Sequence, residues 1–377
     1  MKNKKFAIID PVGLKAGMNC YDLGLLNALN QESIKAYAFS NFKDTSFQNV
    51  VQKKVFAFKK RSVPAMLLQY LYGTVYALFY CRLAGIKYVL FHIFSATQKE
   101  YVQLKLAKRL GLQIISIVHD IESLSKEDQQ TLKHKIYNLS DHLIVHNNLS
   151  YKSLIAEISE DNKAKISIIP HGNYTDFVLP NERPEVSEGL GIHFQSGKKY
   201  LLFFGQIKPV KGLDILLKAM ADLPEDFVLV IAGRPHRDDF GKYQSIINKL
   251  NIQSKIMPII RFITDEERDF LFKKCDALVL PYRKIFQSGV LLMALSYGLP
   301  IVASDLEANK EIITHNQNGY LFPDGDSKEL AQQIIQLFEG DNLSRLQSAA
   351  LETANTKFSW HVIAKKYLEI LQGTALK

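Results

Sequence analysis

Short apolar segments alternate with segments of helical pattern through both halves of this chain of 377 residues, and this alternation constrains the fold more than any other feature. Apolar segments without polar alternation are typical of strands in a parallel sheet covered by helices on both faces. The expected strands are 6–10, 36–40, 88–92, 113–118, 142–145 and 166–169, then 200–204, 227–232, 256–262, 277–280, 300–303 and 320–322. The sequence therefore predicts an α/β protein with two sheets, because the chain is too long for one ordinary core.

A stretch rich in Pro, Gly and polar residues, 179–198, separates the two series of strands. Such a composition is typical of a linker between domains. We expect an N-terminal domain over 1–180, a linker over 181–198, a C-terminal domain over 199–357 and a final helical segment over 358–377.

Composition excludes several classes of protein. A content of 47% hydrophobic and 23% charged residues is that of a globular protein and excludes a disordered chain. Cys20, Cys81 and Cys275 are far apart and form no C-x-x-C pair, so we expect neither disulfides nor a zinc site, which fits the cytoplasm. The apolar run 6–9 ends at Asp10 and is too short for a signal peptide.

Charge is spread unevenly along the chain. Residues 1–180 hold 23 Lys and Arg against 14 Asp and Glu, so the first half carries the whole formal net charge of +9. A one-sided positive field attracts nucleic acid, an anionic membrane surface or a phosphate-bearing acceptor.

The segment 63–81 holds nineteen residues without a charge, directly after Lys59, Lys60 and Arg61. Its length approaches that of a membrane span, but Gly73 and several tyrosines interrupt it. Three interpretations are open: a buried or partly exposed helix, a helix lying in a membrane interface, and a true span.

Two places in the first half are typical of ligand-binding loops. The expected strand 6–10 leads into a glycine turn, Gly13 to Gly17, whose backbone N–H groups suit an anion at a helix start; a plain structural turn is the alternative. His119 follows the expected strand 113–118, where a side chain contacts ligands in a crevice or is simply a loop histidine. No G-x-G-x-x-G or P-loop motif follows a strand, which disfavours dinucleotide oxidoreductases and P-loop enzymes.

The second half contains two candidate phosphate sites. Gly205 to Gly212 follows the strand 200–204 and puts Lys211 just before an amphipathic helix, so that an ammonium group adds to the helix dipole. Ser288, Gly289 and Val290 open a further helix, and these small residues leave backbone N–H groups accessible to phosphate oxygens.

These motifs together resemble glycosyltransferase family 4, the retaining enzymes of the GT-B fold. Gly205 to Gly212 is similar to its G-R-x-x-x-x-K-G segment, and 281–304 is similar to its nucleotide-sugar segment. Further likenesses are Glu311 before 318–323, the loops at Gly13, His119 and Ile169 to Asn173, and the ending Phe358-Ser359-Trp360. The resemblance implies two Rossmann-like domains facing each other across a cleft, with a C-terminal helix crossing back to the first.

The resemblance also implies roles for individual residues. His119 and Lys211 are the expected catalytic residues, His119 at the donor sugar or the β-phosphate side of the cleft and Lys211 at the diphosphate. The implied donor-binding set is Gly13, Gly17, Gly205, Gln206, Lys211, Phe262, Ile263, Ser288, Gly289, Val290 and Glu311. Within it, Phe262 and Ile263 are expected at the base, and Glu311 at sugar or ribose hydroxyls.

Two departures from the family pattern stand out. The two glutamates of its E-x(7)-E motif fall at Ile285 and Met293, and Gln206 replaces its usual arginine. We interpret these changes as divergence, so that the expected activity is still retaining transfer from a nucleoside diphosphate sugar, without a metal or other cofactor. The nature of the sugar, nucleotide and acceptor is not encoded in these motifs.

The expected acceptor is a glycan or a lipid-linked molecule in the assembly of a bacterial-type surface polysaccharide or glycoconjugate. The expected location is the cytoplasm or the inner face of the plasma membrane, bound through the basic N-terminal domain. Three alternatives are a non-catalytic nucleotide-sugar-binding subunit, a GT-B epimerase and a nucleic-acid-binding protein. The last explains the charge but not the two helix starts, so no nucleic-acid partner is expected.

Overall fold

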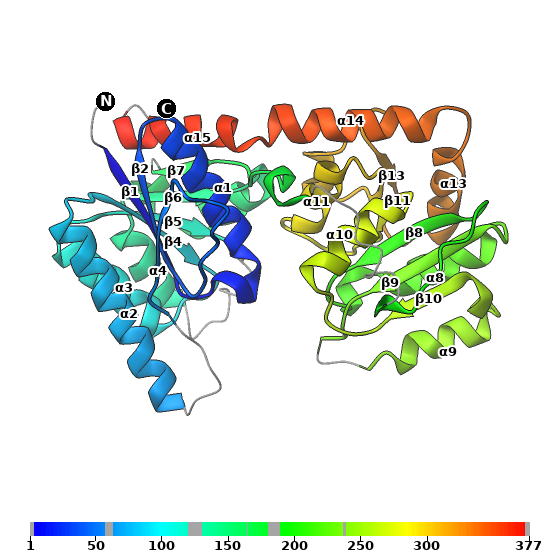
Figure 1. Ribbon diagram of the computed structural model, residues 1–377, viewed down its shortest axis with the longest axis horizontal. Coiled ribbons are helices and arrows are strands. Elements are labelled where there is room, and N and C mark those ends of the chain that lie inside the picture. Colours follow the sequence, from blue (N-terminus) through cyan, green and yellow to red (C-terminus); the bar gives the residue numbers. More distant parts are fainter. Residues whose placement is uncertain are drawn as a thin grey trace. The chain divides into compact units, whose positions relative to one another are not determined.

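The computed structural model describes residues 4–56, 63–119, 130–163, 165–179, 189–236 and 239–373. The chain divides into two compact units, Met1–Gly172 with Phe358–Lys377, and Asn173–Lys357 (Figure 1). The second unit begins earlier than the predicted linker, because the Asn173 side chain donates to the Ala354 carbonyl and the Tyr174 N–H donates to Ser296 Oγ. The final segment belongs to the first unit.

The first unit is built on a seven-stranded parallel sheet in the order β3-β2-β1-β4-β5-β6-β7. Its strands are β1 (Lys5–Asp10), β2 (Lys35–Ser40), β3 (Val51–Lys54), β4 (Tyr88–Ile93), β5 (Gln113–Val118), β6 (His142–Val145) and β7 (Ile166–Ile168). β1 pairs with both β2 and β4, so Phe6 lies between Ala36 and Tyr88. The strand order reverses here, and ligands of open parallel sheets bind at the carboxyl ends beside such a reversal.

Helices cover both faces of this sheet. They are α1 (Met18–Gln31), α2 (Val63–Leu83), α3 (Gln98–Arg109), α4 (Gln130–Leu139), α5 (Asn148–Ile155), α6 (Glu160–Lys163) and α15 (Trp360–Gln372). On one face, Ile9 and Phe91 share a core with Leu78 of α2. On the other, the ring of Phe6 meets Tyr367 of α15 edge-on, with centroids 6.3 Å apart.

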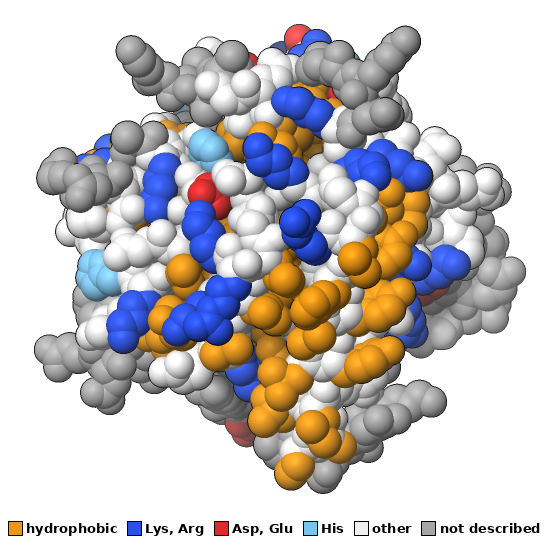
Figure 2. All heavy atoms as spheres, turned by 90° about the vertical axis from the view of Figure 1, so that its left-hand side faces the viewer, with side chains coloured by type: hydrophobic (Ala, Val, Ile, Leu, Met, Phe, Trp, Pro, Cys, Tyr) orange, Lys and Arg blue, Asp and Glu red, His pale blue; other side chains and the backbone are white. Residues whose placement is uncertain are grey.

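Helix α2 has apolar side chains on both sides. Ala77, Leu78 and Cys81 are fully buried against the sheet. The opposite side is exposed and forms the hydrophobic band that runs down the face shown in Figure 2. Among the described residues, no helix is both long enough and apolar enough to cross a membrane. Of the three interpretations of segment 63–81, the spanning helix is therefore not supported.

The second unit is built on a six-stranded parallel sheet in the order β10-β9-β8-β11-β12-β13. Its strands are β8 (Lys199–Phe204), β9 (Phe227–Ala232), β10 (Ile256–Ile259), β11 (Ala277–Leu280), β12 (Ile301–Ser304) and β13 (Tyr320–Phe322). The strand order of this sheet also reverses at its centre, between β8 and β11. The two sheets confirm the predicted α/β class with two parallel sheets.

The helices of this unit are α8 (Leu213–Asp222), α9 (Gly241–Lys249), α10 (Asp265–Lys274), α11 (Gly289–Tyr297), α12 (Glu307–Lys310), α13 (Ser327–Leu337) and α14 (Asn342–Lys357). Side-chain caps fix several of their starts: Thr264 closes a capping box with Glu267 at α10, and Asp326 caps α13. Gly298 ends α11 with φ +65°, a conformation that favours glycine.

Two strand predictions differ from the structure. The edge strand β3 was not predicted, because its sequence Val-Gln-Lys-Lys lacks an apolar run. β10 ends at Ile259 and does not continue to residue 262, since the Arg261 N–H turns back to the Ile259 carbonyl. Phe262 and Ile263 therefore lie in the loop after an edge strand.

Candidate functional site

In the second unit the carboxyl ends of β8 and β9 carry a pair of glycines that touch. Gly205 has φ +107° and Gly233 has φ +151°. A Cβ placed on Gly233 would lie 1.8 Å from the Gly205 carbonyl oxygen, so no side chain fits there. The two strand ends consequently present bare backbone to any ligand at this edge.

The loop after Gly205 is held against the end of β11. Gly212, with φ +66°, packs so closely that a Cβ would lie 1.8 Å from the Pro281 carbonyl oxygen. Arg283 fixes the same loop, donating to Asp214 Oδ1 and Oδ2 at 2.9 and 2.7 Å and to the Pro209 carbonyl. Burial raises the pKa of Asp214, but the hydrogen bonds and charge of Arg283 outweigh burial and leave that pKa below its usual value.

This packing positions Lys211. Its Nζ lies 3.7 Å from the centroid of the Tyr282 ring, a cation–π contact at the carboxyl end of β11. Tyr282 is 1% exposed, and its carbonyl accepts a hydrogen bond from Ser304 Oγ. The ammonium group of Lys211 is thereby held against a buried ring.

The start of α11 lies beside the Gly205 loop. The Cβ position of Gly205 is 3.8 Å from Val290 Cγ2, so the two predicted segments are neighbours. Ser288, 4% exposed, caps α11 by accepting from the Leu291 N–H at 3.2 Å. The first amides of a helix have no acceptor within the helix, and this end carries its partial positive charge.

Gly289 at this start lies close to a neighbouring tyrosine. A Cβ there would lie 2.9 Å from Tyr174 Oη. Tyr174 therefore brings a hydroxyl to the first turn of α11, a contribution that no sequence motif indicated. Together with Lys211, this end of the sheet offers an ammonium group, helix amides and a hydroxyl, a combination that suits the oxygens of a diphosphate.

Other predicted residues lie at the same edge of the sheet but further from its centre. Phe262 is 70% exposed in the loop after β10, with Ile263 next to it, and β10 is separated from β8 by β9. Glu311 is exposed at the end of α12, which follows β12. Met293 stands in the second turn of α11 and Ile285 in the loop before it, both partly buried.

One cation was missed by the sequence analysis. Arg234 follows Gly233 and is exposed, and its carbonyl accepts a hydrogen bond from the Ile207 N–H at 3.0 Å. Arg234 is thus paired through the backbone with the residue after Gln206, the position where the family arginine is absent. The family arginine is expected after β8, whereas Arg234 follows β9. The sequence alone does not show that these two strands are neighbours, so it could not indicate Arg234.

In the first unit, Asp10 at the end of β1 organises the predicted glycine turn. Its two carboxylate oxygens accept from the Val12 and Gly13 N–H groups at 2.8 and 2.9 Å. Gly13 has φ +43° and Gly17 has φ +70°, and α1 starts directly after Gly17. A Cβ on Gly17 would meet no atom within 4 Å, so the helix start is open on that side.

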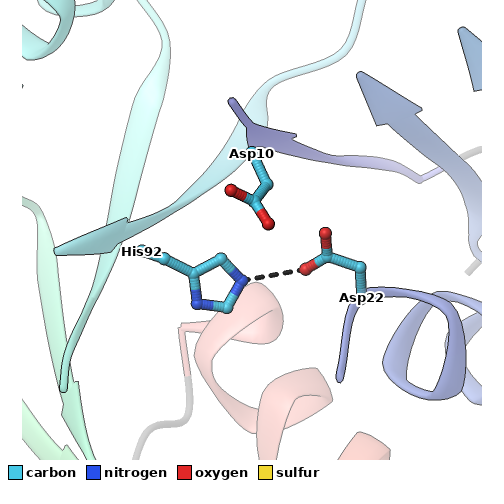
Figure 3. Close-up of side chains that lie close together, drawn as sticks. All are labelled: Asp10, Asp22 and His92. Carbon is cyan, nitrogen blue, oxygen red and sulfur yellow. Dashed lines mark hydrogen bonds and ion pairs between the residues drawn. The ribbon is translucent and has the colours of Figure 1, made fainter. Parts of the chain in front are cut away.

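His119, at the end of β5, is part of a hydrogen-bonded chain that the sequence did not indicate. Its Nε2 lies 2.7 Å from His92 Nδ1, and His92 Nε2 lies 2.8 Å from Asp22 Oδ1. Figure 3 shows Asp22 and His92 pointing toward each other, with Asp10 next to both. His92 comes from β4 and Asp22 from α1. The adjacent Asp120 lies outside the described residues.

Burial controls the protonation of this chain. Burial and the neighbouring Asp10 raise the pKa of Asp22 to about 7. Burial lowers the pKa of His92, but the hydrogen bond and charge of Asp22 outweigh it and raise that pKa above its usual value. Burial, with the neighbouring histidines, lowers the pKa of His119 well below 6.5. At neutral pH the Asp22–His92 pair therefore retains a proton, and His119 is neutral.

Two more histidines complete a cluster at this edge. His146 follows β6 and donates from Nδ1 to the Ile169 carbonyl at 2.8 Å, while His171 lies after β7. Burial lowers their pKa values to about 3 and about 4. Tyr21 of α1 stands at the centre, with its ring within 6.4 Å of all four imidazoles and 5.1 Å from Trp360.

The same cluster contains a possible set of metal ligands. Asp10, Asp22 and His92 each offer one ligand atom, and these atoms lie within 4.8 Å of one another. However, both Asp10 oxygens accept backbone N–H groups, and His92 Nε2 is bonded to Asp22. These hydrogen bonds account for the arrangement, so we assign no metal to it.

Comparison with known proteins shows which family the second half resembles. Residues 182–353 match the family model described as glycosyl transferases group 1. This match covers less than half of the chain, and over that part the chain is similar to these enzymes. Residues 93–164 match a second model, the N-terminal domain of glucosyltransferase 3-like proteins. The candidate phosphate site, from Gly205 to Glu311, lies wholly within the matched residues 182–353.

Curated relatives resemble only part of this chain. Spore coat protein SA of Bacillus subtilis is 29% identical over 50% of this chain and 52% of its own length. Phosphatidyl-myo-inositol mannosyltransferase of Mycobacterium leprae is 27% identical over 47% of each chain. The chain thus spans about half the length of these relatives.

Solved structures establish the fold over the whole chain. Alr3699/HepE of Anabaena, solved with UDP and glucose, superposes with a TM-score of 0.73 at 17% identity, covering 98% of this chain and 100% of that one. At this identity the likeness bears on the fold alone. The fold of the chain is GT-B, as the motifs predicted.

Proposed function

We propose that this chain is a retaining glycosyltransferase that takes a sugar from a nucleoside diphosphate sugar. Two contacts carry the proposal: Lys211 is held on the Tyr282 ring after β11, and Gly205 after β8 lies against Val290 in the first turn of α11. This arrangement suits a pyrophosphate group and lies at the carboxyl ends of β8 and β11, where ligands of such sheets bind.

The proposed reaction needs stabilisation of the leaving diphosphate, because negative charge accumulates on it as the glycosidic bond breaks. Lys211 supplies a full positive charge, and the amides of Gly289 and Val290 supply the positive end of a helix dipole. These groups do the work that a metal ion does elsewhere, so we propose that transfer proceeds without a metal. Arg234 compensates for the arginine that Gln206 replaces.

We assign His119 to the sugar being transferred, with Asp22 and His92 as positioning residues. His92, holding a proton toward Asp22, determines through its Nδ1 which nitrogen of His119 carries hydrogen. The low pKa of His119 keeps it neutral, so one of its ring nitrogens donates a hydrogen bond while the other accepts one.

Relatives narrow the choice of substrates to test. HepE was crystallised with UDP and glucose, which supports UDP-glucose as the first donor. The Mycobacterium leprae relative is named for a phosphatidyl-myo-inositol substrate, which supports a lipid-linked or glycan acceptor. We place the reaction in the assembly of a surface polysaccharide or glycoconjugate, at the cytoplasmic face of the plasma membrane.

The test is donor turnover measured as UDP release from UDP-glucose, with lipid-linked and glycan acceptors and with EDTA present. We expect acceptor-dependent UDP release that EDTA does not abolish, and a product with the anomeric configuration of the donor. Inverted product would reject the retaining mechanism, and loss of turnover in EDTA would reject metal-independent transfer.

A non-catalytic subunit that binds nucleotide sugars is the second candidate. Ile285 and Met293, where the family pattern has glutamates, favour it because neither side chain can bond ribose or sugar hydroxyls. This candidate predicts that the protein binds UDP-glucose but releases no UDP with any acceptor until a partner transferase is added.

A further inference from the structure

Helix α2 exposes an apolar stripe on the first unit. The members are at least 37% exposed and recur every three or four residues, so they lie along one side of the helix; they are Leu67, Leu68, Leu71, Tyr72, Val75, Tyr76, Phe79 and Leu83. Between Leu67 and Leu83 the stripe is about 24 Å long, at 1.5 Å per residue. Contiguous apolar surface of this kind marks an interaction site in a globular protein.

The stripe does not contribute to the hydrophobic core of the first unit. The side of α2 that faces the sheet already buries Ala77, Leu78 and Cys81. Leu68 is 68% exposed and Leu83 is 86% exposed, so neither contributes appreciably to the core. A helix that is apolar on its outer side as well as its inner side is expected to contact a second apolar environment.

The charged side chains around the stripe are mostly positive (Figure 2), although Glu100 of α3 lies near Tyr70 of α2. Segment 63–81 holds no charged residue, and Arg82 stands at its end. Lys53 Nζ lies 4.6 Å from the ring centroid of Tyr80 on α2, while Lys99 and Lys105 are exposed on α3, which packs against α2. On the face in Figure 2, Lys and Arg side chains border the band and outnumber Asp and Glu.

Tyrosines form part of the stripe in a regular row. The rings of Tyr72 and Tyr76 are stacked with centroids 6.2 Å apart, and Tyr76 and Tyr80 repeat the same spacing. Tyrosine rings are enriched at the boundary between lipid tails and headgroups, because one end is apolar and the other polar.

We propose that α2 lies in the surface of an anionic membrane, with its stripe among the upper acyl chains and the flanking cations at the headgroups. Symmetrical pairing of two copies through the stripe would bring cations toward cations, whereas anionic lipid complements them. The inference deepens the proposed function by identifying the surface through which a lipid-linked acceptor is reached, but its test does not require transfer.

Vesicle flotation of the full chain tests this inference. Vesicles of phosphatidylcholine alone are compared with vesicles in which about a third of the lipid is phosphatidylglycerol. We expect binding to the anionic vesicles that weakens with salt. The variant Leu68→Gln/Leu83→Gln should lower the partition coefficient about tenfold or more, since two inserted side chains are lost. Ile335→Gln, at a 37% exposed site on α13, is the matched control and should bind as the parent does.

A charge variant separates the two contributions. Arg82→Gln/Lys99→Gln/Lys105→Gln should lower binding to anionic vesicles roughly fivefold per cation, because each cation near such a surface is worth about 1 kcal/mol. Fluorescence of Trp360, the single tryptophan, verifies that each variant of the first unit is folded. Absence of binding by the parent at low salt would overturn the inference, as would equal binding by the stripe variant.

Sedimentation without lipid distinguishes a membrane-binding stripe from a dimer interface. A parent dimer that becomes monomeric in the stripe variant would assign the stripe to a second copy and overturn the inference. Vesicle binding without any glycosyl transfer would support membrane binding by α2 and count against the proposed enzyme activity. Glycosyl transfer without vesicle binding would support the enzyme activity and overturn membrane binding by α2.

Discussion

At the residue scale, the first unit depends on side chains that act through one another. His119 alone is a histidine at a strand end, but its bond to His92 and the bond of His92 to Asp22 place it in a chain of three buried groups. The carboxylate of Asp22 is what keeps a proton on His92 despite complete burial. A buried hydrogen bond of this kind to a charged group is worth about 1.5–3 kcal/mol.

Asp22→Asn should therefore lower kcat for transfer by about 10- to 100-fold, the rate equivalent of that interaction. Only the charge of Asp10 then opposes burial, so the pKa of His92 falls and the limb of the pH profile of kcat that reports His92 should move to lower pH. Affinity for UDP should be unchanged, since we assign the diphosphate to the second unit. Asp226→Asn, at a partly exposed carboxylate, is the control; an unshifted profile in Asp22→Asn would remove Asp22 from the mechanism.

The sequence identified individual candidate site residues only where they belong to a contiguous motif. Lys211 and Ser288 lie in contiguous segments with recognisable spacing, and the structure brings those segments together. Arg234, Tyr174 and His92 belong to no such segment, because pairing between strands or packing between helices creates their positions. The four histidines do share one property visible in the sequence, since each lies at or just after the end of a strand.

At the element scale, the carboxyl edge of the first sheet gathers four imidazoles from β4 to β7 and their loops. Only one of them, His92, has its pKa raised; burial lowers the pKa values of His119, His146 and His171. Packing by α15 contributes to this burial, because Trp360 occupies the space left by Gly24 and Gly172.

The buried histidines should make the first unit sensitive to acid. The folded pKa values of His146 and His171, about 3 and about 4, lie below the unfolded value of about 6.5, so the unfolded chain binds more protons below that pH. Their stabilising effect is complete above pH 6.5 and is lost as pH falls, by about 2 kcal/mol for each group at pH 5. The raised pKa of His92 offsets part of this loss.

Urea unfolding followed by Trp360 fluorescence at pH 7 and pH 5 measures this loss in the first unit. His146→Asn keeps a donor for the Ile169 carbonyl but cannot titrate, so it should lose less stability between the two pH values than the parent, by about 2 kcal/mol. His193→Asn, at an exposed site in the second unit, is the control. Equal losses in His146→Asn and the parent would show that His146 is not the acid-sensitive group.

Elements were predictable where their patterns were strong. Apolar runs identified the buried strands, because both faces of a parallel sheet are covered. β3 escaped detection because an edge strand with Val-Gln-Lys-Lys has no such run, and β10 was predicted too long because residues 260–263 continue an apolar pattern into a turn. All three interpretations of segment 63–81 were helical, which the structure confirms, but only the structure distinguished the buried side of the helix from its exposed side.

At the scale of the whole molecule, the two units divide the proposed work. The second unit has the features of a diphosphate site, with Lys211, the α11 start and bare glycine backbone at the centre of its sheet. The first unit holds the histidine cluster, the positive charge and the apolar stripe of α2. Net charge, motifs and length predicted this division, whereas the detailed chemistry of the first unit required the fold.

The central claim is that Lys211 and the start of α11 bind a diphosphate, and titration calorimetry with UDP in EDTA tests it most directly. The parent protein and Lys218→Ala, which removes an exposed lysine of α8, should bind UDP alike. Lys211→Ala should bind it about 10- to 100-fold more weakly, because one hydrogen bond to a charged group is lost. Equal affinity of Lys211→Ala and the parent, or no binding of UDP by any of the three proteins, would contradict the account.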